Sequence, residues 1–501
     1  MDLFSGIIGG FQVSLQPINL FYCFIGVTIG TLIGVLPGIG PTGTLAILLP
    51  TTLGISPATA IIMLAGIYYG AMYGGSTTAI LVNVPGEAAS VITCLDGYQM
   101  ARKGRAGVAL GISAIGSFIG GTFSIIALTL LVFPLAQFGL KFGPPEFFSL
   151  IVLSMTLVTY MARGSMDKAL IMVLAGFILS TVGLDLTSGM PRFTFGIPTL
   201  LDGVGIVPVA MGLFGIAEVL ENIESLAERS IFETKINQLL PNRQDWKRSI
   251  GPISRGSVLG FFLGLIPGVG GATTGPIISY SIEKRISKNP NEFGHGAIEG
   301  VAGPETANNA ATGAAFVPLL ALGIPSHVVM AILFGALILH GVPPGPMLLI
   351  QHPDIFWGVI SSMYIGNCML LLLNLPLIGI WVKIVKIPPR FLMPLIIFFC
   401  LIGAYALNNN IADVTVMIFF GIFGYIMRKI NYDAVPFLMG FILGPLIETS
   451  FRQSMIMSDG KFSIFLQKPI AMVVLMISAL ILISSGFLTY REKKGKLYKE
   501  L

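Results

Sequence analysis

Apolar stretches long enough to cross a lipid bilayer recur along the whole chain, and this recurrence constrains the fold more than any other feature. A helix needs about 20 apolar residues to cross roughly 30 Å of hydrocarbon. Of the 501 residues, 54% are hydrophobic and only 11% are charged, whereas charged residues make up about a quarter of an ordinary globular domain. The sequence therefore predicts an all-α polytopic membrane protein.

About a dozen membrane segments are predicted from apolar runs bounded by charge, glycine or proline, and some of them can be re-entrant. They lie near residues 18–50, 56–84, 107–135, 145–162, 168–184 and 199–220, and then near 254–281, 310–340, 355–384, 389–407, 411–427, 432–448 and 469–489. Basic clusters such as Arg102 to Arg105 and Arg428-Lys429 can all lie on one side, which the positive-inside rule makes cytoplasmic.

The predicted organisation has two membrane halves on either side of a polar stretch. Residues 1–220 form the first half, 221–253 a cytoplasmic or interfacial linker, 254–350 the second half with its repeat, 351–490 the C-terminal helices and 491–501 a basic cytoplasmic tail. The first residues contain neither a basic region nor a clear cleavage site, so no removable signal peptide is expected. The basic residues are scattered between apolar runs, which argues against a nucleic-acid interface.

A pattern of glycine and proline occurs twice, once on each side of the linker. Gly26, Gly30 and Gly34 precede Pro37-Gly38-Ile39-Gly40, and Gly256, Gly260 and Gly264 precede Pro267-Gly268-Val269-Gly270. All six positions match in register, which favours duplication over chance. Each copy is followed by an apolar run that ends in a proline turn, Asn83-Val84-Pro85-Gly86 in the first half and Gly323-Ile324-Pro325-Ser326 in the second.

These breaks have a specific physical effect on a membrane helix. Proline removes a backbone donor and glycine permits positive φ, so the helix opens. An open backbone at membrane depth is tolerated only where protein buries it or a water-filled cavity lines it. A half-helix that restarts there directs its free N–H groups at an anion. One such break would indicate a kink or close packing, but paired breaks predict the central site of a transporter, with one half moving against the other.

Polar side chains near the breaks are candidate ligands. The hydroxyls of Ser76, Thr77, Thr273 and Thr274 can hold a carboxylate or coordinate Na⁺, although such residues also bond their own i−4 carbonyls. Glu305, Asn308 and Asn309 are expected at a helix entrance, where Asn309 can be an N-cap, and an acid at membrane depth indicates function. The other acids, Glu87 and Asp185 among them, lie near predicted segment ends, where solvated or interfacial positions are expected.

The sequence lacks the motifs that are usual for enzymes and for ATP-driven transporters. The sequence contains no G-x-x-x-x-G-K-[ST], no H-E-x-x-H and no G-x-S-x-G. The four cysteines form no C-x-x-C pair, and the histidines have no metal-ligand spacing. We therefore expect no enzyme activity, no cofactor and no metal site other than one for Na⁺.

At these residues the sequence resembles the large membrane subunit of the tripartite tricarboxylate transporter family. The resemblance rests on the two P-G-[IV]-G stretches, Tyr73-Gly74-Gly75-Ser76, the Asn83–Gly86 turn, Gly303-Pro304-Glu305-Thr306-Ala307-Asn308-Asn309 and the Gly323–Ser326 turn. It implies a permease of the bacterial inner membrane that works with a small four-helix membrane subunit and a periplasmic solute-binding protein. It further implies uptake driven by an H⁺ or Na⁺ gradient.

The resemblance also implies an inverted-repeat, elevator-type fold with re-entrant hairpins. Basic residues after the second break, Lys284, Arg285 and Lys288, fit a hairpin that returns to the cytoplasm, and a single broken crossing is the alternative. The expected substrate is an organic carboxylate, a tricarboxylate or a related acid. An ion channel or an exporter for small anions remains the alternative function, because glycine-rich breaks also build ion filters.

The predicted substrate and ion site gathers the backbone of the breaks and the polar groups near them. Its members are Pro37, Gly38, Gly40, Ser76, Thr77, Asn83, Pro85, Gly86, Pro267, Gly268, Gly270, Thr273, Thr274, Glu305, Asn308, Asn309, Pro325 and Ser326.

Overall fold

The computed structural model describes residues 3–36, 40–162, 165–185, 187–224, 238–385 and 392–500. Its first half contains α1 (Leu3–Ser14), α2 (Pro17–Val35), α3 (Gly40–Leu48), η1 (Leu49–Thr52), α4 (Pro57–Val82), η2 (Ala88–Ser90), α5 (Val91–Met100), η3 (Ala101–Arg105), α6 (Ala106–Gly139), α7 (Pro144–Met161), α8 (Met166–Ser180), β1 (Gly183–Leu184), β2 (Pro191–Arg192), η4 (Pro198–Leu200), α9 (Ile206–Ala210), η5 (Met211–Ile216) and α10 (Ala217–Glu224). The two short strands pair antiparallel, Gly183 with Arg192 and Leu184 with Pro191.

The remainder of the described chain is helical. It contains α11 (Arg243–Leu265), α12 (Gly271–Ile286), η6 (Pro290–Glu292), α13 (Glu299–Ala314), α14 (Phe316–Leu322), α15 (Val328–Leu339), α16 (Pro346–Gln351), α17 (Pro353–Asn374), α18 (Ile378–Ile384), α19 (Leu392–Asn408), α20 (Ile411–Lys429), α21 (Ala434–Met457), α22 (Ile464–Gln467) and α23 (Pro469–Glu500). The backbone of the basic tail is therefore a continuation of α23 as far as Glu500.

Eight helical segments of the described residues are long and apolar enough to cross a bilayer. They are Pro17–Val35, Pro57–Val82, Ala88–Gly139, Pro144–Met161, Ile206–Glu224, Pro353–Asn374, Ile411–Lys429 and Ala434–Met457. Four shorter apolar helices accompany them, Leu3–Ser14, Val328–Leu339, Met393–Asn408 and Pro469–Ser484. The prediction of an all-α, multi-pass membrane protein is confirmed.

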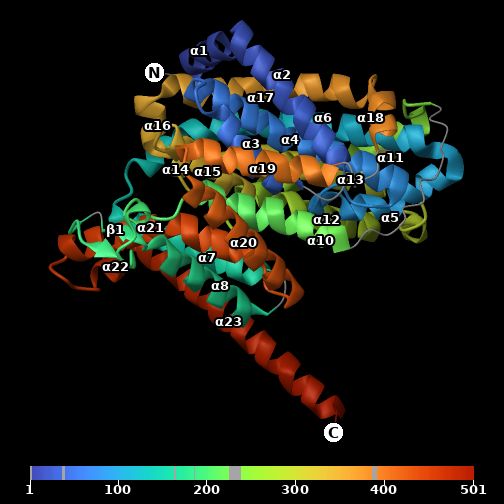
Figure 1. Ribbon diagram of the computed structural model, residues 1–501. Coiled ribbons are helices and arrows are strands. Elements are labelled where there is room, and N and C mark those ends of the chain that lie inside the picture. The colour runs from blue at the N-terminus through green and yellow to red at the C-terminus, as the bar shows by residue number, and fades with distance from the viewer. Residues whose placement is uncertain are drawn as a thin grey trace.

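The helices separate into two groups in space (Figure 1). Helices α7, α8, α20, α21 and α23 gather along one side of the bundle, and α1, α2 and α17 lie along the opposite side. The C-terminal part of α23 extends beyond the bundle. We call the first set the lateral group; the rest of the bundle contains both glycine patterns and their breaks.

Both glycine patterns let two helices pack with their backbones in contact, and they do so in the same register. A Cβ atom added to any of these glycines would lie 2.2 to 2.5 Å from a carbonyl oxygen of the neighbouring helix. On α2, Gly26, Gly30 and Gly34 face Met63, Ile67 and Ala71 of α4; on α11, Gly256, Gly260 and Gly264 face Gly303, Ala307 and Ala311 of α13. In each pair, residue numbers increase in the same direction along both helices, so the two helices run parallel.

Corresponding residues of the two helix pairs are separated by nearly the same number of positions along the chain. Gly260 stands 230 residues after Gly30, whereas the facing residue Ala307 stands 240 residues after Ile67. The second pair therefore has ten more residues between its glycines and the helix on which they pack.

The second helix pair runs in the opposite direction to the first. Ser76 of α4 is hydrogen-bonded to Glu305 of α13, whereas the earlier residue Tyr68 packs on the later residue Phe316, with 6.2 Å between ring centroids. As α4 advances, its partners lie earlier in the chain, so α4 and the α13–α14 segment are antiparallel. Since α2 is parallel to α4 and α11 to α13, the two pairs are oppositely oriented.

Helices α11 and α12 form an antiparallel hairpin whose tip is the second break. The guanidinium of Arg255 in α11 lies 2.6 Å from the Glu283 carboxylate in α12, at nearly equal distances along the chain from the tip. Close to the tip, a Cβ on Gly271 would lie 2.5 Å from the backbone nitrogen of Gly264. The chain therefore turns back at Pro267–Gly270 and does not continue in one direction.

The stretch assigned to the linker contains the beginning of this hairpin. Residues 225–237 lie outside the described part of the chain. Helix α11 begins at Arg243, where the side chain of Asn242 accepts hydrogen bonds from the N–H groups of Gln244 and Asp245 at 2.8 and 2.9 Å. Residues 243–253 are therefore continuous with the glycine-bearing helix.

Candidate functional site

The two proline turns have matching backbone geometry. Asn83, with φ 56° and ψ 32°, ends α4 in the left-handed conformation, and Gly323, with φ 69° and ψ 27°, ends α14 in the same way. Four residues later, a side chain caps the next helix: Glu87 accepts a hydrogen bond from Ala89 N–H, and His327 accepts one from Val329 N–H. Both apolar runs thus stop and restart by the same local arrangement.

Within each half, the break lies against the proline turn. A Cβ on Gly86 would lie 2.1 Å from the carbonyl oxygen of Gly34, just before the first break. In the second half, Gly268 N–H donates to the Ser326 carbonyl at 2.7 Å. Gly268 has a φ of +83°, which glycine adopts without strain. In the second half the break and the proline turn are therefore in direct contact, and in the first half the proline turn contacts the end of α2 that precedes the break.

The structure describes only part of the first break. Pro37 and Gly38 lie outside the described residues. Gly40, with φ +63°, restarts the chain as α3, and a Cβ there would meet no atom within 4 Å. The contribution of Pro37 and Gly38 to a site remains a prediction from the sequence.

Glu305 lies at the centre of the interface between the halves. Its side chain is 1% exposed; Ser76 donates a hydrogen bond to its Oε2 at 2.5 Å and Thr93 donates to its Oε1. Ser113 of α6 places a third hydroxyl near this carboxylate. Helices α4, α5 and α6 from the first half thus surround an acid from the second.

The expectation that Glu305, Asn308 and Asn309 stand at a helix entrance is wrong. All three lie inside α13, which begins at Glu299, because the glycines and alanines around them allow the helix to pack tightly from its start. Asn309 is therefore no N-cap: its Nδ2 donates to Ser117 Oγ at 2.7 Å and to the Glu305 carbonyl at 3.2 Å. The three polar side chains project into the protein interior from one helix.

Glu87 is a member of the site that sequence reasoning missed. A solvated or interfacial position was expected, but the residue is only 7% exposed, since Gly75 leaves it space: a Cβ on Gly75 would lie 2.7 Å from its Cγ. Asn308 Nδ2 lies 3.5 Å from Glu87 Oε1. The available signal was its position two residues after Pro85, which His327 occupies after Pro325.

The carboxyl groups of Glu87 and Glu305 are buried without a basic partner in the described part of the chain. No lysine or arginine among the described residues forms an ion pair with Glu87 or Glu305. Asn308, which is 1% exposed, also leaves its Oδ1 without a hydrogen-bond partner. An unpaired buried carboxylate is costly unless a proton or a cation neutralises it. The arrangement is therefore suited to taking up a positive charge.

A second polar contact joins the halves, and its two residues correspond to Asn308 and Glu87 in the other half. The hydroxyl of Tyr68 lies 3.0 Å from Nε2 of His327. Tyr68 and Asn308 are separated by 240 residues, as are Glu87 and His327. In each case a helix side chain of one half contacts the turn side chain of the other.

The remaining predicted residues differ in their proximity to this centre. Thr77 is buried near Ser76, whereas Thr274 bonds only the local carbonyls of Val269 and Gly270 at 3.4 Å. Asn83 is exposed, and Pro85, Pro267, Gly270, Thr273 and Thr274 are half-buried, while Gly86, Pro325 and Ser326 are buried. The structure thus brings together Ser76, Thr77, Glu305, Asn308 and Asn309, and leaves Thr273, Thr274 and Asn83 apart from them.

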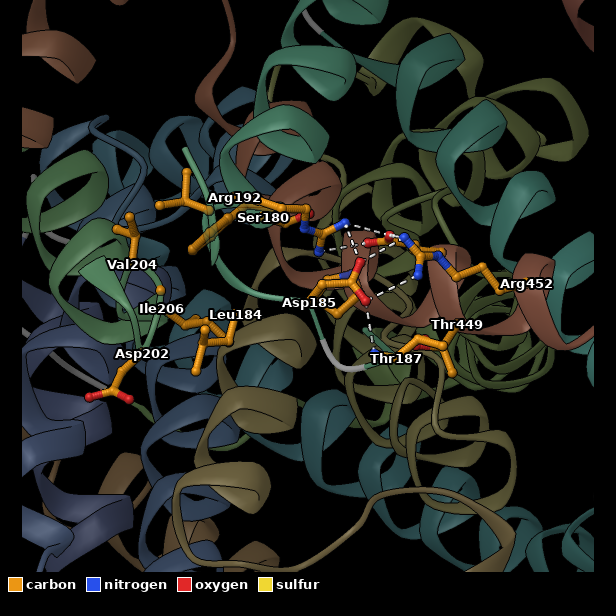
Figure 2. Close-up of a pocket in the computed structure, with 15 residues that line it drawn as sticks. Ser180, Leu184, Asp185, Thr187, Arg192, Asp202, Val204, Ile206, Thr449 and Arg452 are labelled. Carbon is orange, nitrogen blue, oxygen red and sulfur yellow. Dashed lines mark hydrogen bonds and ion pairs between the residues drawn. The ribbon is translucent and has the colours of Figure 1, made fainter. Parts of the chain in front are cut away.

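A larger cavity lies elsewhere, at the ends of α8 and α21 beside the β1–β2 ribbon (Figure 2). It measures about 250 Å³. Asp185 pairs with Arg452 at 2.8 Å and with Arg192 at 3.2 Å, and Glu448 pairs with the same two arginines at 2.7 and 2.6 Å. The charges therefore balance within the cluster, while Asp202 lies apart on the far side of the cavity.

The Asp185 carboxylate was expected to be solvated, but it is 5% exposed. The N–H groups of Ser188 and Thr187, and then Arg452, lower the pKa of Asp185 well below its usual range. This cluster fixes the segment between α8 and α9 to α21, and it contains none of the predicted site residues.

The fold and the site together define a class of protein. Interrupted helices from two oppositely oriented halves, meeting around buried polar groups in a multi-pass membrane protein, are typical of secondary transporters. The chain belongs to the tripartite tricarboxylate transporter TctA family, whose model matches residues 20–439.

One relative is similar over the whole length of the chain, and two others match about half of it. An uncharacterised 52.8 kDa protein in the TAR-I ttuC' 3' region of Agrobacterium vitis is 49% identical over 500 residues, which cover 100% of this chain and 99% of the relative. An uncharacterised protein in the TAR-II ttuC' 3' region of the same organism is 49% identical over 241 residues, 48% of this chain and 99% of the relative. An uncharacterised protein of Methanocaldococcus jannaschii is 22% identical over 281 residues, 54% of this chain and 64% of the relative. No solved structure matches the chain.

Proposed function

We propose that the chain is the permease subunit of a binding-protein-dependent secondary transporter that imports an organic carboxylate, a tricarboxylate or a related acid, across the bacterial inner membrane. An H⁺ or Na⁺ gradient drives uptake. A small four-helix membrane subunit and a periplasmic solute-binding protein complete the system. Membership of the TctA family supports this proposal.

One structural observation carries the proposal. The two halves that carry the backbone breaks meet at an interface that contains two buried carboxyl groups, Glu305 and Glu87, with no basic partner among the described residues. Broken helices offer N–H groups to an anion, while unpaired acids at membrane depth accept a cation. A coupled transporter needs both kinds of site close to each other.

The matched glycine registers, the matched proline turns and the opposite direction of the two helix pairs support an inverted duplication. In this proposal the tips of the breaks, with Ser76, Thr77, Asn308 and Asn309, replace the hydration shell of the carboxylate. The break at Pro37–Gly40 plays the same role as the one at Pro267–Gly270.

The contacts between the halves change the expected movement. Tyr68 with His327 and Asn308 with Glu87 hold the halves together, so sliding one half against the other would break buried polar contacts. The tip of the second hairpin instead rests on the lateral group, where a Cβ on Gly268 would meet Leu157 and Ser154 of α7. We therefore place the elevator movement between the joined halves and the lateral group.

Uptake into proteoliposomes tests the proposal. The full chain is reconstituted with its small subunit, and binding protein and a panel of organic acids are added outside under an imposed H⁺ or Na⁺ gradient. We expect gradient-driven accumulation of at least one carboxylate, and stimulation of its uptake by the same acid inside. Absence of accumulation across a broad panel would overturn the proposal, and accumulation without such counterflow would favour a channel.

A pair of variants locates the site. Gly268→Val and Gly38→Val are each expected to abolish uptake while the protein remains inserted and assembled with the small subunit. Normal uptake by both variants would place the site away from the breaks.

A further inference from the structure

A small cavity lies beside Glu305, next to the interface of the two halves. It measures about 10 Å³ and is lined by Tyr73, Ser76, Thr77, Ser113 and Asn374, together with three apolar residues. A space of this size holds one water molecule or one ion of similar dimensions. Its polar lining comes from α4, α6 and the last residue of α17.

Two of the hydroxyls around this cavity have their hydrogens engaged elsewhere. Ser76 donates its hydrogen to Glu305 Oε2 at 2.5 Å. Tyr73 donates to Asn367 Oδ1 at 3.3 Å. A hydroxyl has one hydrogen and two lone pairs, so these two groups have only lone pairs left for an occupant.

Asn374 adds an oxygen without a partner. Its Nδ2 donates to the Leu370 carbonyl at 3.0 Å, and this bond fixes the orientation of the amide because an oxygen there would face another oxygen. The residue is 3% exposed, and its Oδ1 has no hydrogen-bond partner. A buried acceptor of this kind requires a donor or a cation.

We propose that this cavity binds a single dehydrated Na⁺ ion, with Asn374 Oδ1 and the hydroxyl oxygens of Ser76, Tyr73 and Ser113 as ligands. A carboxylate would be repelled by so many lone pairs. A water molecule has only two hydrogens to donate to these oxygens, whereas a cation is attracted to all of them and also balances the charge of Glu305. Neutral oxygens beside one carboxylate suit a monovalent ion, because Ca²⁺ and Mg²⁺ take more oxygens or retain water.

This inference deepens the proposed function and rests on it for its role in transport. The ion lies next to Ser76, and Ser76 bonds the carboxylate of Glu305. Its charge balances that carboxylate, which has no ion-pair partner in the described part of the chain. Sodium would thereby connect α17 and the first half to α13 of the second half.

Thermal unfolding of the purified full chain tests the site without transport. Na⁺ is titrated as the chloride against choline chloride at constant ionic strength. We expect the melting temperature to rise saturably with Na⁺ alone. In Asn374→Leu, the half-saturating Na⁺ concentration should rise by about tenfold or more, a factor that corresponds to ~1.4 kcal/mol.

Asn19→Leu is the matched control. Asn19 is 2% exposed and hydrogen-bonded to Val13 and Thr59, away from the cavity, so this variant loses stability and keeps the wild-type response to Na⁺. A melting temperature that is independent of Na⁺ would show that the cavity holds water only and would overturn the inference, as would an unchanged response in Asn374→Leu.

A second variant decides the matter if Asn374→Leu does not fold. Asn374→Asp keeps an oxygen at this position and adds charge, so it should respond at lower Na⁺ concentrations than the wild type; an unchanged or weaker response contradicts the inference.

The two proposals also fail separately. Carboxylate uptake together with a melting temperature that does not respond to Na⁺ removes the sodium site alone, and stabilisation by Na⁺ without uptake of any carboxylate removes the transport function alone.

Discussion

Tyr68 in α4 and His327 in the second proline turn are hydrogen-bonded, with 3.0 Å between the phenol oxygen and Nε2. Asn308 and Glu87 form the corresponding contact from the other half at 3.5 Å. In the first contact the helix residue belongs to the first half and the turn residue to the second half, and in the other contact this assignment is reversed. Each half therefore contacts the proline turn of the other half. The interrupted backbones are held by side chains, so their geometry depends on single residues that can be replaced.

Replacing Gly268 should disrupt transport more than replacing Gly270. Both residues have positive φ, which costs an L-residue roughly 1–2 kcal/mol. In Gly268→Ala the new Cβ would also lie 2.6 Å from Leu157 Cβ and 2.8 Å from the Ser154 carbonyl, whereas at Gly270 it would meet nothing within 4 Å. We expect Gly268→Ala to lose most of its uptake and Gly270→Ala to keep a substantial part, measured in proteoliposomes at matched protein amounts. Equal activity in the two variants would contradict the contact between the hairpin tip and α7.

Replacing Gly30 should destabilise the protein through the contact between α2 and α4. A Cβ there would lie 2.3 Å from the Ile67 carbonyl, and forcing extra atoms into a packed interior costs about 1–3 kcal/mol. Gly9 is the control, because it lies in α1 with no atom within 4 Å of the added Cβ, and Gly9→Ala should gain about 0.5–1 kcal/mol from helix propensity. Thermal unfolding in detergent measures both; a Gly30→Ala variant as stable as Gly9→Ala would rule out the close approach.

Neutralising Glu305 should separate accumulation from exchange. Glu305→Gln keeps the size of the side chain but cannot carry the charge that a coupling cation balances. We expect uptake against a gradient to fall to background, while exchange of substrate across the membrane continues. Glu146→Gln is the control, since Glu146 is likewise buried, at 7% exposed, but accepts a hydrogen bond from Gly143 N–H at the start of α7. Accumulation by Glu305→Gln at the wild-type rate would exclude this carboxylate from coupling.

The Asp185 cluster should stabilise the protein in a pH-dependent manner. Hydrogen bonds from Ser188 and Thr187 and the charge of Arg452 lower the pKa of Asp185, so its ionised form is favoured in the folded state. Its contribution is then full above the ordinary aspartate pKa of about 4 and is lost as pH falls through the lower folded value. Asp185→Asn should melt below the wild type at pH 7, and the difference should shrink below about pH 4.

Asp202 provides the control for that measurement, because it lines the same cavity but lies apart from the arginines. Asp202→Asn should melt close to the wild type throughout. A difference between Asp185→Asn and the wild type that stays constant from pH 7 to pH 3 would show that the charge of Asp185 does not contribute.

The sequence predicted the helical class and the breaks because both depend on local chemistry. Pro267 removes a donor and Gly268 permits positive φ wherever the chain places them. The membrane segments followed in the same way from apolar length, as at Pro144–Met161, where residues 145–162 were predicted. Glu305 was selected because an acid inside an apolar region is unusual in any fold.

What the sequence could not provide depends on contacts between distant residues. Glu87 looks like a loop acid until Gly75, in another element, leaves space for its side chain. Asn374 looks like the end of a helix until its cavity brings it close to Ser76, 298 positions earlier. The helix entrance was placed wrongly at Asn309 because polar residues near a proline are typical of caps, whereas here α13 continues through Pro304.

The ten additional residues of the second helix pair bear on the mechanics of transport. They extend the connection around η6, where Asp96 Oδ1 accepts hydrogen bonds from the N–H groups of Gly294, Gly296 and Ala297 at 2.6 to 2.9 Å. The second half therefore has a longer chain between its break and the helix that its glycines face than the first half has. In the proposed transport cycle, the two halves are thus not mechanically equivalent.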